Sequence, residues 1–281
     1  MNLFRVLLLL MAGILLFVIV FAALLNLSAP VITPGNYDLP QTEEPAPVEY
    51  YDPVYKHTYS YENFTMNNGV LSYEDENYRS QLGIDVSAHQ TAIDWNAVAA
   101  DGVEFAFVRA GYRGYETGEL HEDDCFRANI EGAQAAGIET GVYFYSQAMN
   151  EEEAIEEAQF VLHLISDYDI DGTIVFDMEI STDYDRIIHM NRDEKTNAAL
   201  AFARTIREAG YVPMIYGSAS WLINDYKMEN LQDECRFWVA NYHSLELPYE
   251  YEFDIWQYTN KGSVPGIEGD VDINIWMVKK N

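Results

Sequence analysis

The stretch TIVFDMEI, residues 173–180, decides the prediction of both the fold and the site. It begins as a run of β-branched and large apolar residues, which is typical of a buried strand, and it carries two acids two positions apart near its end. Because side chains alternate between the faces of a strand, Ile174 and Phe176 face one way. Asp177 and Glu179 then face the other way, roughly 6–7 Å apart. Burying charge without a partner is unfavourable. The pattern therefore predicts either a functional pair of acids or a strand that leaves the core and exposes both carboxylates to water.

Alternating strand and helix patterns surround this stretch. Strands are predicted at Gly83–Ser87, Phe105–Ala110, Gly141–Ser146, Thr173–Ile180, Val212–Tyr216, Phe237–Asn241, Asp254–Thr259 and Val271–Met277. Helices are predicted at Ile93–Ala100, Asp123–Ala136, Glu151–Ser166 and Lys195–Ala209. Strands that alternate with helices form a parallel sheet, and roughly 200 residues with eight strands indicate an α/β barrel of the TIM type. In such barrels the chemistry lies at the carboxyl ends of the strands, and the two acids stand at such an end.

The first 80 residues have a different texture. The apolar run Val6–Leu25 is about 30 Å long as a helix, which matches the thickness of a bilayer core. No clean cleavage site follows it and Arg5 precedes it, so we expect an uncleaved membrane anchor over residues 1–28 with a cytoplasmic N-terminus. Secretion after signal cleavage is the alternative. Residues 29–80 are rich in proline and are predicted to be an extracellular spacer, which leaves residues 81–281 for the barrel.

The charge balance and the cysteines restrict the function further. Asp and Glu outnumber Lys and Arg by 46 to 16, which gives a formal charge of −30 and argues against a nucleic-acid partner. Cys125 and Cys235 form no C-x-x-C pair, and two separately buried thiols are favoured over a disulfide. The histidines have no zinc-ligand spacing, so no metal site is predicted.

Other predicted strand ends carry acids as well. Asp85 lies in the first strand and Asp272 in the last, and Asp254 precedes the seventh. These acids have no clear cationic partner in the sequence. Crowding of like charges raises the pKa of one member so that it holds a proton near neutrality, which is what a general acid needs. Paired carboxyl groups of this kind cleave glycosidic bonds. Taken singly, Asp254 fits a solvated loop acid better than a site residue.

Aromatic residues accompany the acids in or just after the strands. Sugar rings stack on such side chains, although each of them also fits an ordinary barrel core. Tyr145, Tyr216 and Tyr242 end their strands and face the predicted mouth. Together with Trp238 and Asp254 they are the predicted substrate-binding residues.

These residues resemble the motifs of glycoside hydrolase family 25, the Chalaropsis-type lysozymes or N-acetylmuramidases. The matching motifs, in family order, are Gly83–Ser87, Ile93–Trp95, Phe107–Tyr112, Gly141–Tyr145, Phe176–Glu179, Trp238–Tyr242, Trp256–Thr259, Val264–Gly266 and Val271–Asn274. One departure is Thr91, where the family commonly has glycine. The resemblance implies a flattened barrel of the (β/α)5(β)3 type, which agrees with the strand count.

The resemblance also implies hydrolysis of the β-1,4 bond between N-acetylmuramic acid and N-acetylglucosamine in peptidoglycan. It matches Glu179 with the general acid, Asp177 with the acid beside it, and Asp85 and Asp272 with the remaining active-site aspartates. No metal or organic cofactor is expected. The expected partners are a glycan strand and, through the N-terminal helix, the cell membrane.

Our mechanistic hypothesis is that Glu179 protonates the leaving oxygen while Asp177 orients the substrate's own 2-acetamido group as the nucleophile. A conventional nucleophile or base role for Asp177 or Asp85 is the rival. At the level of function, a membrane-tethered glycan-binding protein without hydrolysis and a chitinase-like hydrolase are the alternatives. The chitinase D-x-x-D-x-D-x-E run is absent before Glu179.

Overall fold

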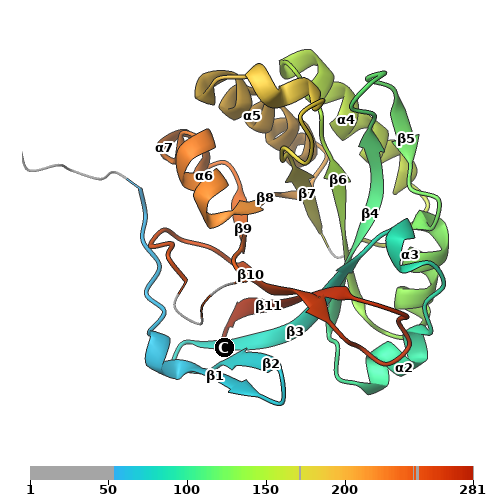
Figure 1. Ribbon diagram of the computed structural model, residues 1–281, viewed down its shortest axis with the longest axis vertical. Coiled ribbons are helices and arrows are strands. Elements are labelled where there is room, and N and C mark those ends of the chain that lie inside the picture. The colour runs from blue at the N-terminus through green and yellow to red at the C-terminus, as the bar shows by residue number, and fades with distance from the viewer. Residues whose placement is uncertain (1–53, 171, 243, 245–246, 281) are drawn as a thin grey trace, which may run out of the picture. The chain divides into compact units, whose positions relative to one another are not determined.

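A computed structural model describes residues 54–170, 172–242, 244 and 247–280. The predicted membrane anchor and residues 29–53 of the predicted spacer lie outside these ranges. Within them no helix is both long and apolar enough to cross a membrane. The described residues form an α/β barrel with a small hairpin beside it (Figure 1).

Eight of the nine strands of the main sheet close into the barrel. In barrel order they are β3 (Tyr78–Val86), β4 (Phe105–Arg113), β6 (Glu139–Tyr145), β7 (Thr173–Asp177), β8 (Val212–Ser218), β9 (Arg236–Ala240), β10 (Ile255–Gly262) and β11 (Val271–Lys279). Neighbouring strands from β3 to β10 run parallel. Strand β11 is antiparallel to both β10 and β3 and closes the ring. The short strand β5 (Leu120–Glu122) pairs with the end of β4.

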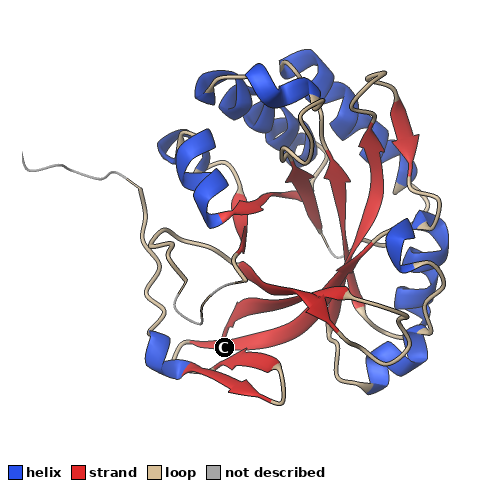
Figure 2. Ribbon diagram, in the orientation of Figure 1, coloured by secondary structure: helices blue, strands red, loops and turns tan. Residues whose placement is uncertain are grey.

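Helices connect the first six barrel strands, whereas loops connect the last three (Figure 2). In chain order the helices and 3-10 turns are η1 (Tyr61–Asn63), η2 (Ala88–Gln90), α2 (Trp95–Ala100), α3 (Phe126–Ala135), α4 (Glu151–Leu164), η3 (Arg186–His189), α5 (Arg192–Glu208), α6 (Ala219–Asp225) and α7 (Met228–Leu231). The predicted α/β barrel, with five helical crossovers and three final strands, is therefore confirmed for the described residues.

Side-chain caps explain where the two longest helices begin. The Asn150 side chain accepts a hydrogen bond from the Glu153 N–H, and three acids occupy the first turn of α4. At α5 the Asn191 side chain and Glu194 form a reciprocal capping box. Each cap satisfies N–H groups that the helix itself leaves unpaired, and acids in the first turn interact favourably with the helix dipole.

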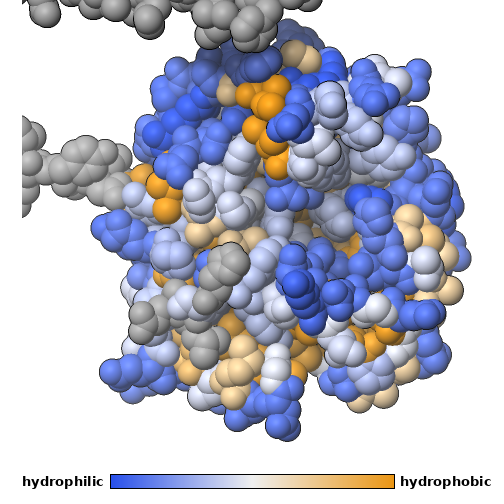
Figure 3. All heavy atoms as spheres, in the orientation of Figure 1, coloured by the Kyte–Doolittle hydropathy of each residue, from blue (hydrophilic) through white to orange (hydrophobic). Residues whose placement is uncertain are grey.

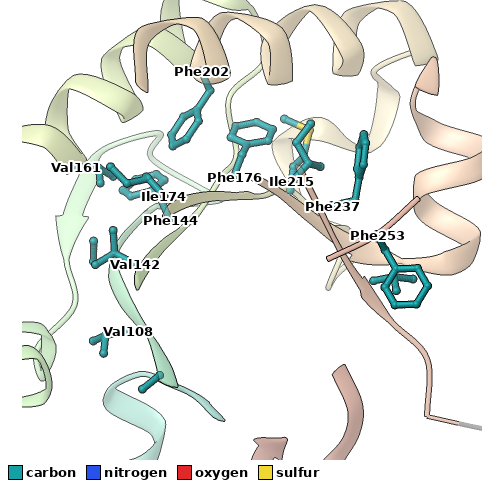
Figure 4. Packing of buried hydrophobic residues seen from close by; sticks show 14 of the residues in the cluster. Val108, Val142, Phe144, Val161, Ile174, Phe176, Phe202, Ile215, Phe237 and Phe253 are labelled. Atoms are coloured by element: carbon teal, nitrogen blue, oxygen red, sulfur yellow. The ribbon is translucent and has the colours of Figure 1, made fainter. Parts of the chain in front are cut away.

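The larger part of the core lies between the outer face of the sheet and the helices (Figure 4). The Phe176 ring of β7 packs 5.0 Å from the Phe202 ring of α5. Ile174, Phe176 and Met178 are fully buried in this layer, whereas Val175 belongs to a separate cluster inside the barrel. The alternation predicted for this stretch is thus confirmed, whereas the strand ends at Asp177 and not at the predicted Ile180.

Aromatic rings fill the barrel interior. The ring centroids of Phe105 and Phe107 are 6.0 Å apart, and those of Phe107 and Trp238 are 4.9 Å apart. Two glycines make room for them: a Cβ on Gly83 would lie 2.2 Å from the Phe105 ring, and one on Gly141 would lie 2.3 Å from the Phe107 ring. The interior is therefore a packed apolar floor beneath the carboxyl ends of the strands.

Residues 54–80, assigned to the spacer on the basis of the sequence, pack on the barrel instead. Strands β1 (Phe64–Asn67) and β2 (Val70–Tyr73) form a hairpin whose two-residue turn has positive φ at both central positions. Leu71 and Tyr73 are buried, and the Phe64 ring lies 5.4 Å from that of Trp256 on β10. No helix follows β9, β10 or β11 among the residues that the structure describes, and the chain before β3 covers part of the outer face of these strands. The proline-rich composition concealed this short alternating segment.

The surface is largely hydrophilic. Hydrophilic residues dominate the face shown in Figure 3, and hydrophobic residues appear there in separate spots.

The two cysteines are free, half-buried thiols in the structure.

Candidate active site

The four acids of the mouth converge on one pocket at the carboxyl ends of the barrel strands. The pocket has a volume of about 170 Å³. Its lining residues are Asp85, Arg109, Tyr143, Tyr145, Asp177, Glu179, Tyr216, Trp238, Gln257 and Asp272. The structure therefore brings together all four acids that the sequence analysis had singled out as catalytic.

Asp85 and Asp272 form a cross-strand pair. They lie directly opposite each other in the antiparallel register of β3 and β11, where side chains are close neighbours and two like charges are unfavourable. Burial, the charge of Asp85 and a hydrogen bond with Asp85 raise the pKa of Asp272 to about 8. Burial also raises the pKa of Asp85, to about 6. The Asp85–Asp272 pair therefore retains a proton near neutrality, and Asp272, which has the higher pKa, carries it.

Two side-chain amides fix the Asp85 carboxylate. Gln257 Nε2 and Asn274 Nδ2 each donate a hydrogen bond of 2.8 Å to Asp85 Oδ2. The indole Nε1–H of Trp238 donates to Asn274 Oδ1 at 2.9 Å, and the hydroxyl of Tyr216 donates to Gln257 Oε1 at 2.8 Å. Because the amide oxygens of Gln257 and Asn274 accept these hydrogen bonds, their N–H groups point toward Asp85. The two hydrogen bonds to the Asp85 carboxylate hold its pKa below the value that burial alone would give.

Asp177 and Glu179 line the same pocket, but only Asp177 belongs to a strand. Asp177 is the last residue of β7, and its buried Oδ1 accepts no hydrogen bond from the described residues. Burial and the charges of Glu179 and Asp85 raise the pKa of Asp177. Glu179 lies two residues beyond the strand; burial and the charges of Asp272 and Asp185 raise its pKa to about 7. A carboxyl group with this pKa is protonated at mildly acidic pH and can donate a proton.

The pocket also contains a cation that the sequence analysis missed. Arg109 lies on the inner face of β4, and its Nε donates to Asp123 Oδ2 at 2.7 Å. Asp123 is itself fixed, because it accepts hydrogen bonds from the N–H groups of Ala88 and Cys125. Arg109 lowers the pKa of Asp177 against the effect of burial. The expectation that the acids have no cationic partner is therefore wrong.

Three of the predicted substrate-binding aromatics, Tyr145, Tyr216 and Trp238, line the pocket. Tyr242 stands beside it: its hydroxyl donates to Gln257 Oε1, and its ring is 38% exposed. Apolar ring faces next to polar atoms of this kind suit a sugar.

Asp254 is the exception among the predicted site residues. It precedes β10, at the amino end of the strand, and lies 3.9 Å from Arg236 Nε in cavities away from the four acids. It shares the face of Trp256 and Tyr258, which belong to the outer core. Prediction of Asp254 as a substrate-binding residue is therefore wrong, because that face of β10 points out of the barrel.

The same alternation of side chains along the strands identifies the pocket residues that the sequence did not predict. If Trp256 and Tyr258 face outward, Gln257 between them must face the pocket, and the structure places it there. Arg109 and Tyr143 likewise occupy inward positions on β4 and β6. Among the described residues, no group of three or more His, Cys, Asp and Glu side chains has an arrangement suited to a metal ion.

Comparison with known proteins agrees with this geometry. Residues 84–267 match the family model described as Glycosyl hydrolases family 25. The autolytic lysozyme of Clostridium acetobutylicum is 26% identical over 195 residues, covering 68% of this chain and 54% of the relative. Lysozyme M1 of Streptomyces globisporus is 28% identical over 204 residues, covering 68% of this chain and 66% of the relative.

The fold has solved counterparts. The modular autolysin LytC of Streptococcus pneumoniae superposes with a TM-score of 0.61 at 27% identity, covering 76% of this chain and 52% of that one; it has also been solved with a synthetic peptidoglycan ligand. A lysozyme of Streptomyces coelicolor has a TM-score of 0.58 at 24% identity, covering 70% of this chain and 91% of that one, and supports the fold. The match spans about half the length of the autolytic lysozyme and of LytC.

Proposed function

The chain belongs to glycosyl hydrolase family 25, and we propose that it is a lysozyme that hydrolyses peptidoglycan at the β-1,4 bond between N-acetylmuramic acid and N-acetylglucosamine. The observation that carries the proposal is the convergence of Asp85, Asp177, Glu179 and Asp272 on one pocket above an apolar floor. Two relatives that match two thirds of this chain are named lysozymes, and a structural relative binds a synthetic peptidoglycan ligand.

Glu179 is the proposed general acid. Its pKa of about 7 keeps the carboxyl group protonated under mildly acidic conditions, and it lines the pocket from a loop beyond the end of β7. Proton transfer from Glu179 to the glycosidic oxygen breaks the bond to the anomeric carbon and releases the leaving sugar as an alcohol.

Asp177 is the proposed partner of the substrate's 2-acetamido group. Its buried Oδ1 lacks a hydrogen-bond donor among the described residues, and an acetamido N–H supplies one. Held in this way, the acetamido oxygen attacks the anomeric carbon as the bond to the leaving oxygen breaks, and water then opens the resulting ring with the deprotonated Glu179 as base. The rival role of Asp85 as nucleophile is disfavoured, because Asp85 Oδ2 is already bound by two amides.

A digestion assay tests the proposal. The soluble part of the chain, residues 54–281, is incubated with purified peptidoglycan, and the new reducing ends are reduced with borohydride and identified. Reduced N-acetylmuramic acid supports the lysozyme. Reduced N-acetylglucosamine indicates the chitinase-like alternative, and binding without release of any reducing end indicates a glycan-binding protein. Glu179→Gln serves as the matched inactive control, since it keeps the shape of the side chain and removes the proton.

We also propose that residues 1–28 anchor the enzyme in the cell membrane with the barrel outside. The apolar run Val6–Leu25 supports this. In cells, the full-length chain is expected in the membrane fraction and sensitive to protease added outside, whereas cleavage of the anchor would release the barrel into the medium.

A further inference from the structure

The general acid proposed above lies where the sheet no longer fixes the backbone. Strand β7 ends at Asp177, and the segment from Met178 to Asp185 runs outside any helix or strand until η3 begins at Arg186. No ladder hydrogen bond therefore holds the peptide of Glu179. Since an acid must be placed within a fraction of an ångström of the bond it protonates, other groups must supply that restraint.

Gln147 supplies the link to Glu179. Its fully buried side chain donates from Nε2 to the Glu179 carbonyl at 3.4 Å and accepts at Oε1 from the Arg186 N–H at 3.0 Å. One side chain thus bridges both ends of the segment that carries the acid. The hydroxyl of Tyr145 reaches the same carbonyl and the Ser181 hydroxyl.

Arg186 in turn fixes Gln147 to helix α4. Its Nη1 donates to the Gln147 carbonyl at 3.1 Å and to Glu153 Oε2 at 3.0 Å, while Nη2 donates to Glu153 Oε1 at 2.8 Å. The guanidinium lies against Gly118, where a Cβ would come within 2.9 Å of Arg186 Cζ. The side chains of Arg186 and Glu153 are only 19% and 24% exposed, so this ion pair is more restrained than a surface pair.

We propose that Arg186, Gln147 and Glu153 form a clamp that positions Glu179 for proton donation, and that Arg186 is a positioning residue of the reaction. This inference rests on the proposed function. Arg186 does not line the pocket, and the charges that raise the pKa of Glu179 are those of Asp272 and Asp185. The clamp therefore acts through geometry. Arg186→Lys keeps the charge but loses the planar fork that binds both carboxylate oxygens.

The first experiment separates positioning from general damage. Arg186→Gln and Arg186→Lys are compared with wild type on a natural glycan and on an aryl glycoside whose leaving group needs no protonation. Loss of positioning lowers kcat on the natural glycan, by up to about 100-fold, with KM little changed and with most of the loss absent on the aryl glycoside. Equal losses on both substrates, or none, would overturn the proposal.

The control is Arg127→Gln, which breaks an ion pair with Glu122 on the surface. It is expected to leave both activities unchanged.

A second measurement does not depend on activity. Hydrogen exchange of the backbone amides from Met178 to Asp185 is followed in the same variants. The clamp predicts faster exchange in Arg186→Gln and Glu153→Gln than in wild type and Arg127→Gln. Unchanged exchange would refute the clamp even if the enzyme is a lysozyme, whereas a wild-type chain without hydrolase activity would refute the proposed function and leave the exchange result standing.

Discussion

Two clusters of acids in this molecule are stabilised in different ways. The mouth acids, Asp85, Asp177, Glu179 and Asp272, crowd one pocket and share a single cation, Arg109, which Asp123 already binds. The α4 acids, Glu153, Glu156 and Glu157, are instead bound by Arg113 and Arg186.

The buried member of the second cluster shows the contrast best. Arg113 Nε donates to Glu157 Oε1 at 2.8 Å, and the remaining guanidinium hydrogens go to Glu156 and to the carbonyls of Gly118 and Glu153. At the mouth, by comparison, each acid has other acids among its neighbours, and Asp85 is bound by two amides and not by a cation. A buried carboxyl group is tolerated if it is paired or if it keeps a proton. Burial raises the pKa of Glu157 to about 7 in spite of Arg113, so the clusters differ chiefly in that the mouth acids line a pocket and Glu157 does not.

The largest difference between the clusters is expected in catalysis. Asp177→Asn removes the proposed acceptor for the acetamido N–H and lowers kcat on peptidoglycan by roughly 10²–10³-fold. Steady-state kinetics on soluble glycan fragments measures this loss. Glu157→Gln, an equally buried acid of the other cluster, is the matched control and should retain kcat within about threefold, since it does not line the pocket. If the two substitutions lower kcat equally, the functional distinction between the clusters fails.

The next largest effect is expected in stability. Arg113→Met leaves Glu157 buried without its cation and should destabilise the fold by about 3–5 kcal/mol. Denaturant unfolding at pH 7 measures it. The double variant Arg113→Met with Glu157→Leu should recover much of the loss, because it removes both charges; no recovery would mean that the pair acts through packing alone.

The sequence predicted the mouth well because alternation in strands is a local rule. It placed Asp85, Asp177, Glu179 and Asp272 inward and assigned Ile174 and Phe176 to the helices, and the structure agrees. It failed for Asp254, because the outward face of β10 is also rich in aromatics and resembles a binding face.

The features that the sequence could not predict depend on contacts between residues that are far apart in the chain. Asp85 is fixed by Gln257 and Asn274, more than 170 positions away, and only barrel closure brings them together. The packing of the chain before β3 on β10 and β11 likewise joins residues that are far apart in the chain. The sequence predicted no helix between the last strands, but no local pattern shows that another segment of the chain packs on them.

The pH dependence of activity tests whether the mouth acids hold the proton that the proposed reaction needs. Because Glu179 must be protonated to act and its pKa is about 7, kcat/KM should fall about tenfold per pH unit above that value. A pH–rate profile between pH 4 and 9 measures this limb. The limb belongs to the coupled group of acids and not to Glu179 alone. A profile that is flat to pH 9 would rule out Glu179 as the acid.

The smallest effect expected is a change in how stability depends on pH. The folded pKa of Asp272 is about 8, raised from 3.8. Between these values the folded state binds more protons than the unfolded state, so stability falls as pH rises through the window. Asp272→Asn removes this titration, and its amide can still donate to Asp85. The variant should therefore match wild type near pH 4 and melt at a higher temperature than wild type at pH 8.

Thermal melts of Asp272→Asn and of Glu156→Gln across this pH range complete the comparison. Glu156 is exposed and bound to Arg113, so its substitution should bring no gain at pH 8. A gain in both variants would mean that net charge, and not the crowding of the mouth acids, sets the alkaline limit of the fold. A gain in Asp272→Asn alone would show that the molecule gives up stability at Asp272 to keep a proton in the pocket of the proposed active site.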